Sequence, residues 1–98
     1  MTRPAIFHDL AEKELNEAAA YYASARPGLG DAFVSEVQRA VEALATSPFA
    51  GTAVEKDVRW WLVRRFPYSV LYRVRDDHTR ILAIAHQKRR PFYWRGRQ

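Results

Sequence analysis

The sequence has no cysteine, and its longest apolar runs are only a handful of residues, such as residues 81–85. The first absence excludes disulfide bonds and thiolate metal sites. The second excludes a membrane-spanning helix, which needs roughly 18 apolar residues in a row. Residues 1–4 also lack the apolar stretch of a secretory signal. We therefore expect a cytoplasmic protein without a membrane partner.

Several kinds of chemistry are also missing from the sequence. The three histidines, His8, His78 and His86, have no spacing that suggests a shared metal, so we predict no metal site and no cofactor. The basic half has no paired carboxylates outside a turn, which argues against glycosidase-like chemistry. No Gly-rich phosphate loop and no Ser/Cys–His triad signature occurs. The 98 residues suffice for one domain, 1–98, with a small core.

Charge is unevenly distributed along the chain. Residues 1–57 carry five basic and nine acidic side chains, a net charge of −4, whereas residues 58–98 carry eleven and two, a net charge of +9. Such a contrast indicates that the second half faces an anion, a polyanion or an acidic protein segment. A basic surface without any partner is the alternative interpretation.

Two amphipathic helices are predicted in the first half, after a short strand at residues 4–8. Asp9 has the character of an N-cap, with Glu12 completing a capping box. A helix at residues 10–24 follows, and a second helix at residues 31–46 has one continuous apolar face. Because the Pro- and Gly-rich turn between them is short, the helices are expected to form an antiparallel hairpin.

The second half changes to a strand-like pattern after a loop at residues 48–57. Strands are predicted at residues 58–66, 69–75 and 80–87, and the last has an apolar centre typical of an inner strand. The order β-α-α-β-β-β predicts an α+β fold, with an N-terminal strand and a helical hairpin packed on one face of a small antiparallel sheet. The other face of the sheet is expected to stay partly open and to carry arginines.

Four arginines are predicted on neighbouring strands. Arg64 and Arg65 follow each other, so only one of them can share a face with Arg73 and Arg75. Like charges that face each other across strands cost stability, so a face with three arginines indicates a binding role. Surface salt bridges to the acidic helices are the alternative.

The C-terminal run from His86 to Arg97 combines five cations with three aromatic rings and no acid. Arginine grips phosphate, aromatic rings stack on bases, and both residue types anchor protein interfaces. In the alternative interpretation, Phe92 and Trp94 fold back onto the core while the cations are solvated.

His86 is the most interesting single titratable group. It ends a predicted strand beside Lys88 and Arg89, and neighbouring cations favour its neutral form, which could act as a base. A strand-end histidine hydrogen-bonded to the backbone is the alternative.

Two segments resemble the ParE branch of the ParE/RelE toxins. Residues 66–74, FPYSVLYRV, resemble its F-P-Y-x-[IVL]-x-Y stretch, and residues 86–94, HQKRRPFYW, resemble its H-x-x-R-x-P-x-Y-W ending. Residues 11–22 are similar to the family's first helix, and residues 47–48 with Gly51 are similar to its post-helix turn. The resemblance covers nearly the whole chain and preserves the order of elements.

The resemblance implies a toxin of a type II toxin–antitoxin system that inhibits bacterial growth, with DNA gyrase as its target. It also implies a cognate antitoxin protein that neutralises the toxin and forms a higher-order complex with it. RelE-like members cut mRNA on the ribosome, so a ribosome-dependent mRNA endonuclease is the alternative. A non-toxic basic RNA-binding module is a second alternative.

Each interpretation nominates its own residues. RNA cleavage needs a base, an acid and stabilisation of charge on the phosphorane. The lysine-rich loop common in ribosome-dependent members is reduced here to Lys56 alone, so we favour gyrase. The nuclease candidates are His86 or Lys56 as base, Arg64 or Arg65 with Arg89 as stabilisers, and Tyr93 as a helper. The target-binding candidates are Arg64, Arg73, Arg89, Arg90, Tyr93 and Trp94.

Overall fold

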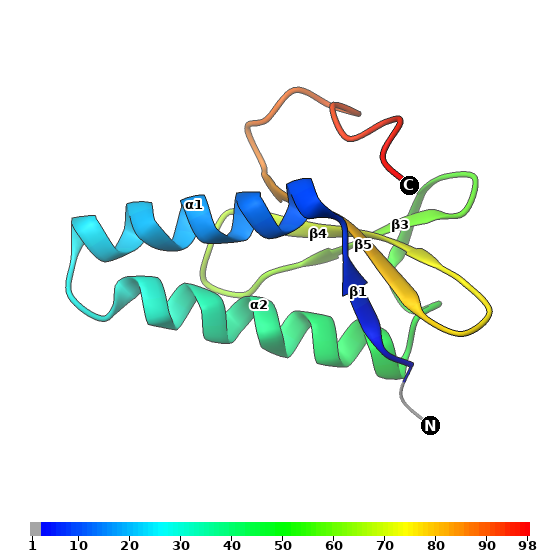
Figure 1. Ribbon diagram of the computed structural model, residues 1–98, viewed down its shortest axis with the longest axis horizontal. Helices are drawn as coiled ribbons and strands as arrows, with labels where there is room; N and C mark the ends of the chain where they lie inside the picture. Colours follow the sequence, from blue (N-terminus) through cyan, green and yellow to red (C-terminus); the bar gives the residue numbers. More distant parts are fainter. Residues whose placement is uncertain (1–2) are drawn as a thin grey trace.

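A computed structural model describes residues 3–98. These residues form two helices and five strands: β1 (Ala5–Phe7), α1 (Asp9–Ala25), α2 (Leu29–Thr46), β2 (Thr52–Glu55), β3 (Val58–Leu62), β4 (Tyr68–Val74) and β5 (Thr79–His86). The strands make one sheet in the order β1-β5-β4-β3-β2. The antiparallel helical hairpin packs on one face of this sheet, and the C-terminal tail runs past the start of α1 (Figure 1). The expected α+β fold is confirmed.

The helical hairpin follows the predicted apolar faces. Phe33, Val37 and Leu44 of α2 are buried in the core against the sheet, as the helical spacing indicates. The helix α2 starts two residues earlier than predicted and therefore includes Gly30. A Cβ atom at Gly30 would lie 2.6 Å from the carbonyl oxygen of Ala19, so glycine permits the close approach of the two helices.

The predicted capping box at the start of α1 is wrong. His8 is the N-cap: its Nδ1 accepts a hydrogen bond from the Leu10 N–H at 3.0 Å. The His8 N–H donates to the Ile81 carbonyl oxygen, which keeps His8 in extended geometry as the last residue held by the sheet. Asp9 is therefore the first helical residue, and its negative charge interacts favourably with the positive end of the helix dipole.

The sheet differs from the prediction in two respects. The strand β1 pairs with β5 in parallel, whereas the other pairs are antiparallel, so the sheet is mixed. The strand β2 lies within residues 48–57, which were predicted to be a loop, and it forms an edge of the sheet. The strand β5 lies between β1 and β4, as its apolar centre predicts.

The predicted face with three arginines does not form. The strand β3 ends at Leu62, and the chain then bends away until Tyr68, whose carbonyl oxygen accepts a hydrogen bond from the Val63 N–H. Arg64 and Arg65 are exposed on this bend, and Arg65 has a positive φ of 71°. Neither arginine therefore lies on a strand.

The opposite face of the sheet carries a second apolar cluster, which includes Val58, Leu71 and Leu82. Trp94 of the tail folds onto this cluster and is only 5% exposed. The alternative interpretation, in which Phe92 and Trp94 fold back onto the core, is therefore confirmed for Trp94. Phe92 remains 39% exposed.

Neither helix within residues 3–98 is long and apolar enough to cross a membrane.

Candidate functional site

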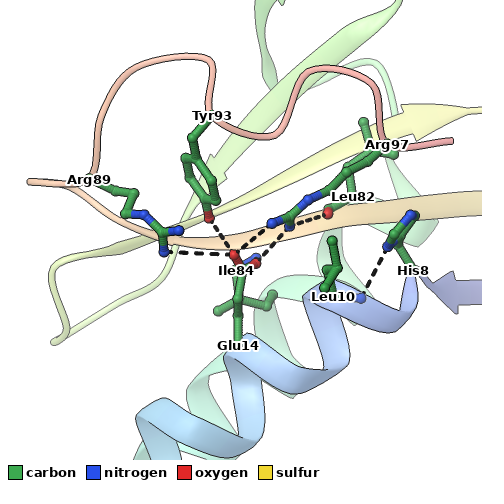
Figure 2. A network of polar contacts seen from close by, with 8 residues as sticks. All are labelled: His8, Leu10, Glu14, Leu82, Ile84, Arg89, Tyr93 and Arg97. Carbon is green, nitrogen blue, oxygen red and sulfur yellow. Dashed lines mark hydrogen bonds and ion pairs between the residues drawn. The ribbon is translucent and has the colours of Figure 1, made fainter.

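The free edge of β5 is where the tail, α1 and the sheet meet. The strand β1 pairs only with Thr79–Ile81, so the Leu82 carbonyl and the Ile84 N–H have no strand partner on that side. The Ile84 N–H instead donates to Glu14 Oε1 at 3.1 Å, and Arg97 Nη1 donates to the Leu82 carbonyl oxygen at 3.0 Å (Figure 2). Side chains of α1 and the tail therefore close the edge where a longer strand would have continued.

Glu14 is the centre of this arrangement. Tyr93 Oη donates to Glu14 Oε2 at 2.8 Å. Arg97 donates to both carboxylate oxygens, at 2.9 and 3.0 Å, and Arg89 Nη1 lies 3.9 Å from Oε2 (Figure 2). The side chains of Glu14 and Arg97 are only 12% and 10% exposed. Such an enclosed, bidentate carboxylate–guanidinium pair has a defined geometry.

The Tyr93 ring is held between two guanidinium groups. The Cζ atoms of Arg89 and Arg97 lie 4.0 and 5.1 Å from the ring centroid, within cation–π range. Burial, the hydrogen bond to Glu14 and the negative charge of Glu14 together raise the pKa of Tyr93 well above its ordinary value. Tyr93 therefore keeps its proton and acts as a donor to Glu14.

His86 is hydrogen-bonded to the backbone, which was the alternative interpretation. Its Nδ1 accepts from the Lys88 N–H at 3.0 Å, and its ring meets the Tyr68 ring at 5.1 Å in a T-shaped contact. A neutral imidazole that accepts at Nδ1 carries its proton on Nε2. In this arrangement His86 has no free lone pair with which to act as a base.

Lys56, the other candidate base, lies at the far end of the sheet. It occupies the turn just before Val58, which pairs with Arg73, whereas His86 pairs with Tyr68. Arg73 and Tyr68 are five residues apart on β4, which separates the two ends by roughly 17 Å. Lys56 is therefore separated from the other nuclease candidates, which lie near the end of the sheet where β5 ends.

Several arginines are paired with acidic residues of the β2–β3 hairpin, not with the acidic helices as the salt-bridge alternative supposed. Arg73 Nε donates to Asp57 Oδ1 at 3.1 Å, and Arg75 lies 3.7 Å from Oδ2. Arg95 binds both Glu55 oxygens, at 3.1 and 2.8 Å, and this hydrogen bonding lowers the pKa of Glu55. Arg73, a target-binding candidate, is thus partly neutralised.

Other cations gather at one end of the sheet without an acidic partner among residues 3–98. The β3–β4 loop and the turn after β5 are joined there by a hydrogen bond from the Gln87 N–H to the Pro67 carbonyl oxygen at 2.8 Å. We call these four exposed side chains the cationic rim: Arg64, Arg65, Lys88 and Arg90. Arg89, which is 55% exposed, borders the rim.

The open face of the sheet is apolar at its centre, and the arginines it carries lie toward its margin, where Arg73 pairs in register with Val58 and Arg80 and shares their face. A groove of about 420 Å³ lies between the sheet and the tail. Trp60, Leu62 and Leu71 line it on the sheet side, and Pro91 and Phe92 line it on the tail side. The arginines stay at the margin because side chains near the middle of this face pack into the second apolar cluster.

Comparison with known proteins agrees with the arrangement of these elements. Residues 5–91 match the family described as the ParE toxin of the type II toxin–antitoxin system, parDE. The chain belongs to this family. Toxin ParE2 of Mycobacterium tuberculosis strain CDC 1551 / Oshkosh is 35% identical over 95 residues, which cover 93% of this chain and 88% of the relative. Toxin ParE2 of strain H37Rv gives the same values.

A solved structure, "Chromosomal ParDE TA system from P. aeruginosa", shares the fold. It matches with a TM-score of 0.75 at 20% sequence identity, covering 87% of this chain and 96% of that chain. The resemblance inferred from the sequence motifs is confirmed: the chain is a ParE-type toxin of a type II toxin–antitoxin system.

Sequence reasoning missed Glu14. One signal was available, because Glu14 lies three residues after Ala11 and four before Ala18, and both alanines are buried. This spacing puts Glu14 on the buried side of α1. A carboxylate there must find donors, and the cations of the tail supply them.

Proposed function

We propose that this toxin arrests bacterial growth by binding DNA gyrase through its tail and cationic rim. The observation that carries the proposal is the engagement of the candidate groups for proton transfer in other contacts. Lys56 lies far from His86, Nδ1 of His86 already accepts a backbone hydrogen bond, and the Tyr93 hydroxyl keeps its proton and donates it to Glu14. A binding surface needs no such group. Arg64, Arg89 and Arg90 are the contacts we favour.

We further propose that a cognate antitoxin neutralises the toxin in the cytoplasm and forms a higher-order complex with it. The matched P. aeruginosa structure is itself described as a ParDE TA system. The net charge of +9 on residues 58–98 favours an acidic partner segment. Association should then slow as salt rises, because screening weakens electrostatic steering. An association rate that does not change with salt would contradict this.

The target is tested by expressing the chain and following DNA supercoiling and mRNA integrity in parallel. Loss of supercoiling before any loss of mRNA supports gyrase. Prompt cleavage of messages in a translating extract would select the RelE-like nuclease. RNA binding without growth arrest would select the non-toxic module.

The contact residues are tested by growth arrest at matched protein levels. Arg64→Ala and Arg90→Ala should each weaken the arrest, and Arg89→Ala should do so as well. Arg26→Ala is the matched control, because Arg26 is an exposed cation at the tip of the helical hairpin. Equal arrest by all four variants would move the target-binding surface elsewhere.

A further inference from the structure

Glu14 is placed unlike the other acidic residues of α1. Glu12 and Glu17 are exposed, whereas the Glu14 side chain is 12% exposed. Within residues 3–98, its carboxylate accepts hydrogen bonds from the Ile84 N–H, the Tyr93 hydroxyl and two nitrogens of Arg97. This single side chain therefore joins α1, β5 and the tail (Figure 2).

The tail segment that carries the proposed target-binding cations makes few backbone contacts with the rest of the fold. Residues 88–92 are all exposed, and their backbone hydrogen bonds stay within local turns. The backbone that carries Arg89 and Arg90 is therefore positioned by the anchored residues on either side, and the Arg89 side chain also contacts the Tyr93 ring. These anchors are the end of β5 before the segment, and Tyr93 with Trp94 after it.

Glu14 also makes the packing around Tyr93 electrostatically favourable. Arg89 and Arg97 lie on the same ring, at 4.0 and 5.1 Å from its centroid, and two guanidinium cations repel each other. The Glu14 carboxylate contacts both arginines and offsets this repulsion. Without the negative charge of Glu14, the pairing of both cations with Tyr93 is unfavourable. The docked position of the tail is then destabilised.

We propose that Glu14 is a positioning residue for the target-binding surface. By holding Tyr93 and Arg97, it fixes the tail so that Arg89 and Arg90 are presented in one orientation. The part of this inference that concerns target binding rests on the proposed function. Glu14 itself is too enclosed to contact a target directly.

The first test measures amide hydrogen exchange in the full-length chain and its Glu14→Gln variant, which keeps the shape of the side chain and removes the charge. Residues 88–97 should exchange about tenfold faster, while α2 remains unchanged. Glu17→Gln is the matched control, because Glu17 lies on the same helix and has no ion pair among residues 3–98. Unchanged exchange in the tail, or equal acceleration throughout the chain, would overturn the proposal.

The second test asks whether Glu14 acts through Arg89 and Arg90. At matched protein levels, Glu14→Gln should raise the dose needed for growth arrest about tenfold. In a background that carries both Arg89→Ala and Arg90→Ala, the same change should add little, because the two side chains whose orientation it disturbs are absent. A purely structural contribution would instead add fully to the effect of the double change. Full additivity would therefore overturn the positioning role.

Should Glu14→Gln fail to fold, Tyr93→Phe removes one donor and keeps the ring, and the same tail-specific exchange is expected at smaller amplitude. Should the unmodified chain not arrest growth, the proposed function fails, whereas the exchange measurement still decides whether Glu14 fixes the tail.

Discussion

Two carboxylates in this molecule each bind two arginines, in very different surroundings. Asp57 is 54% exposed and pairs with Arg73 and Arg75. Glu14 is 12% exposed and pairs with Arg97 and Arg89. Exposed pairs contribute about 0–1 kcal/mol because water and salt compete with them. The enclosed pair adds hydrogen bonds from a phenol and a backbone amide, so equal charges have unequal structural consequences.

The two carboxylates also differ in what they connect. Asp57 is 16 residues from Arg73 and lies in the turn just before β3, which pairs with the strand of Arg73. Glu14 is 79 residues from Tyr93 and 83 from Arg97. Asp57 therefore adds to a sheet that is already formed, whereas Glu14 decides where the tail lies.

The largest expected effect comes from Glu14→Leu. This change leaves Arg97 enclosed without its partner, and we expect the free energy of unfolding to fall by about 3 kcal/mol. Urea unfolding followed by circular dichroism measures the loss. Asp57→Leu is the control, and an equally large loss there would contradict the distinction between the two sites.

The second-largest expected effect is a loss of stability at alkaline pH. Tyr93 has a raised pKa in the folded chain, first because of burial and then because of Glu14. Above about pH 10 the unfolded chain loses this proton while the native chain keeps it, so the free energy of unfolding falls by up to about 1.4 kcal/mol per pH unit. Below that pH the contribution is fully present. Ultraviolet titration should show the pKa of Tyr93 decreasing in Glu14→Gln, and an unchanged pKa would refute the link.

Tyr93→Phe isolates one hydrogen bond of the enclosed site. The ring and its two guanidinium contacts remain, while Glu14 loses the phenol donor. We expect the free energy of unfolding to fall by about 1 kcal/mol. Tyr21→Phe, at a tyrosine that is 67% exposed, should leave it nearly unchanged in the same urea experiment. Equal losses in both variants would rule out a special contribution from Tyr93.

The smallest effect is expected at Asp57. The change Asp57→Asn should lower the free energy of unfolding by about 0.5 kcal/mol, and the difference should vanish near 1 M salt because screening already weakens an exposed pair. The Glu14→Gln difference should persist at the same salt concentration. A salt-independent Asp57→Asn effect would remove the contrast between the sites.

Much of the fold could be predicted because its elements carry local signals. The apolar spacing of Phe33, Val37 and Leu44 specifies the buried face of α2, and the apolar centre of β5 specifies an inner strand. The strand β2 has no such signal, since Thr52–Glu55 is four residues long, lies at an edge and pairs irregularly with β3. Its existence depends on β3 offering a free edge, which is a tertiary property.

The candidate site could be predicted only in part. The motif-bearing tail was recognisable from its composition, but Glu14 lies between Glu12 and Glu17, which differ from it only in burial. The strand-like pattern of residues 58–66 predicts a strand that includes Arg64 and Arg65, whereas the bend before Pro67 removes both from the sheet. In each case, contacts between distant segments decide the outcome.

The most direct test of the account is inhibition of DNA supercoiling by purified gyrase, with the unmodified chain, Glu14→Gln and Glu17→Gln compared at equal concentrations. We expect equal inhibition by the unmodified chain and Glu17→Gln, and inhibition about tenfold weaker by Glu14→Gln. Equal inhibition by all three proteins, or none by any of them, would contradict it.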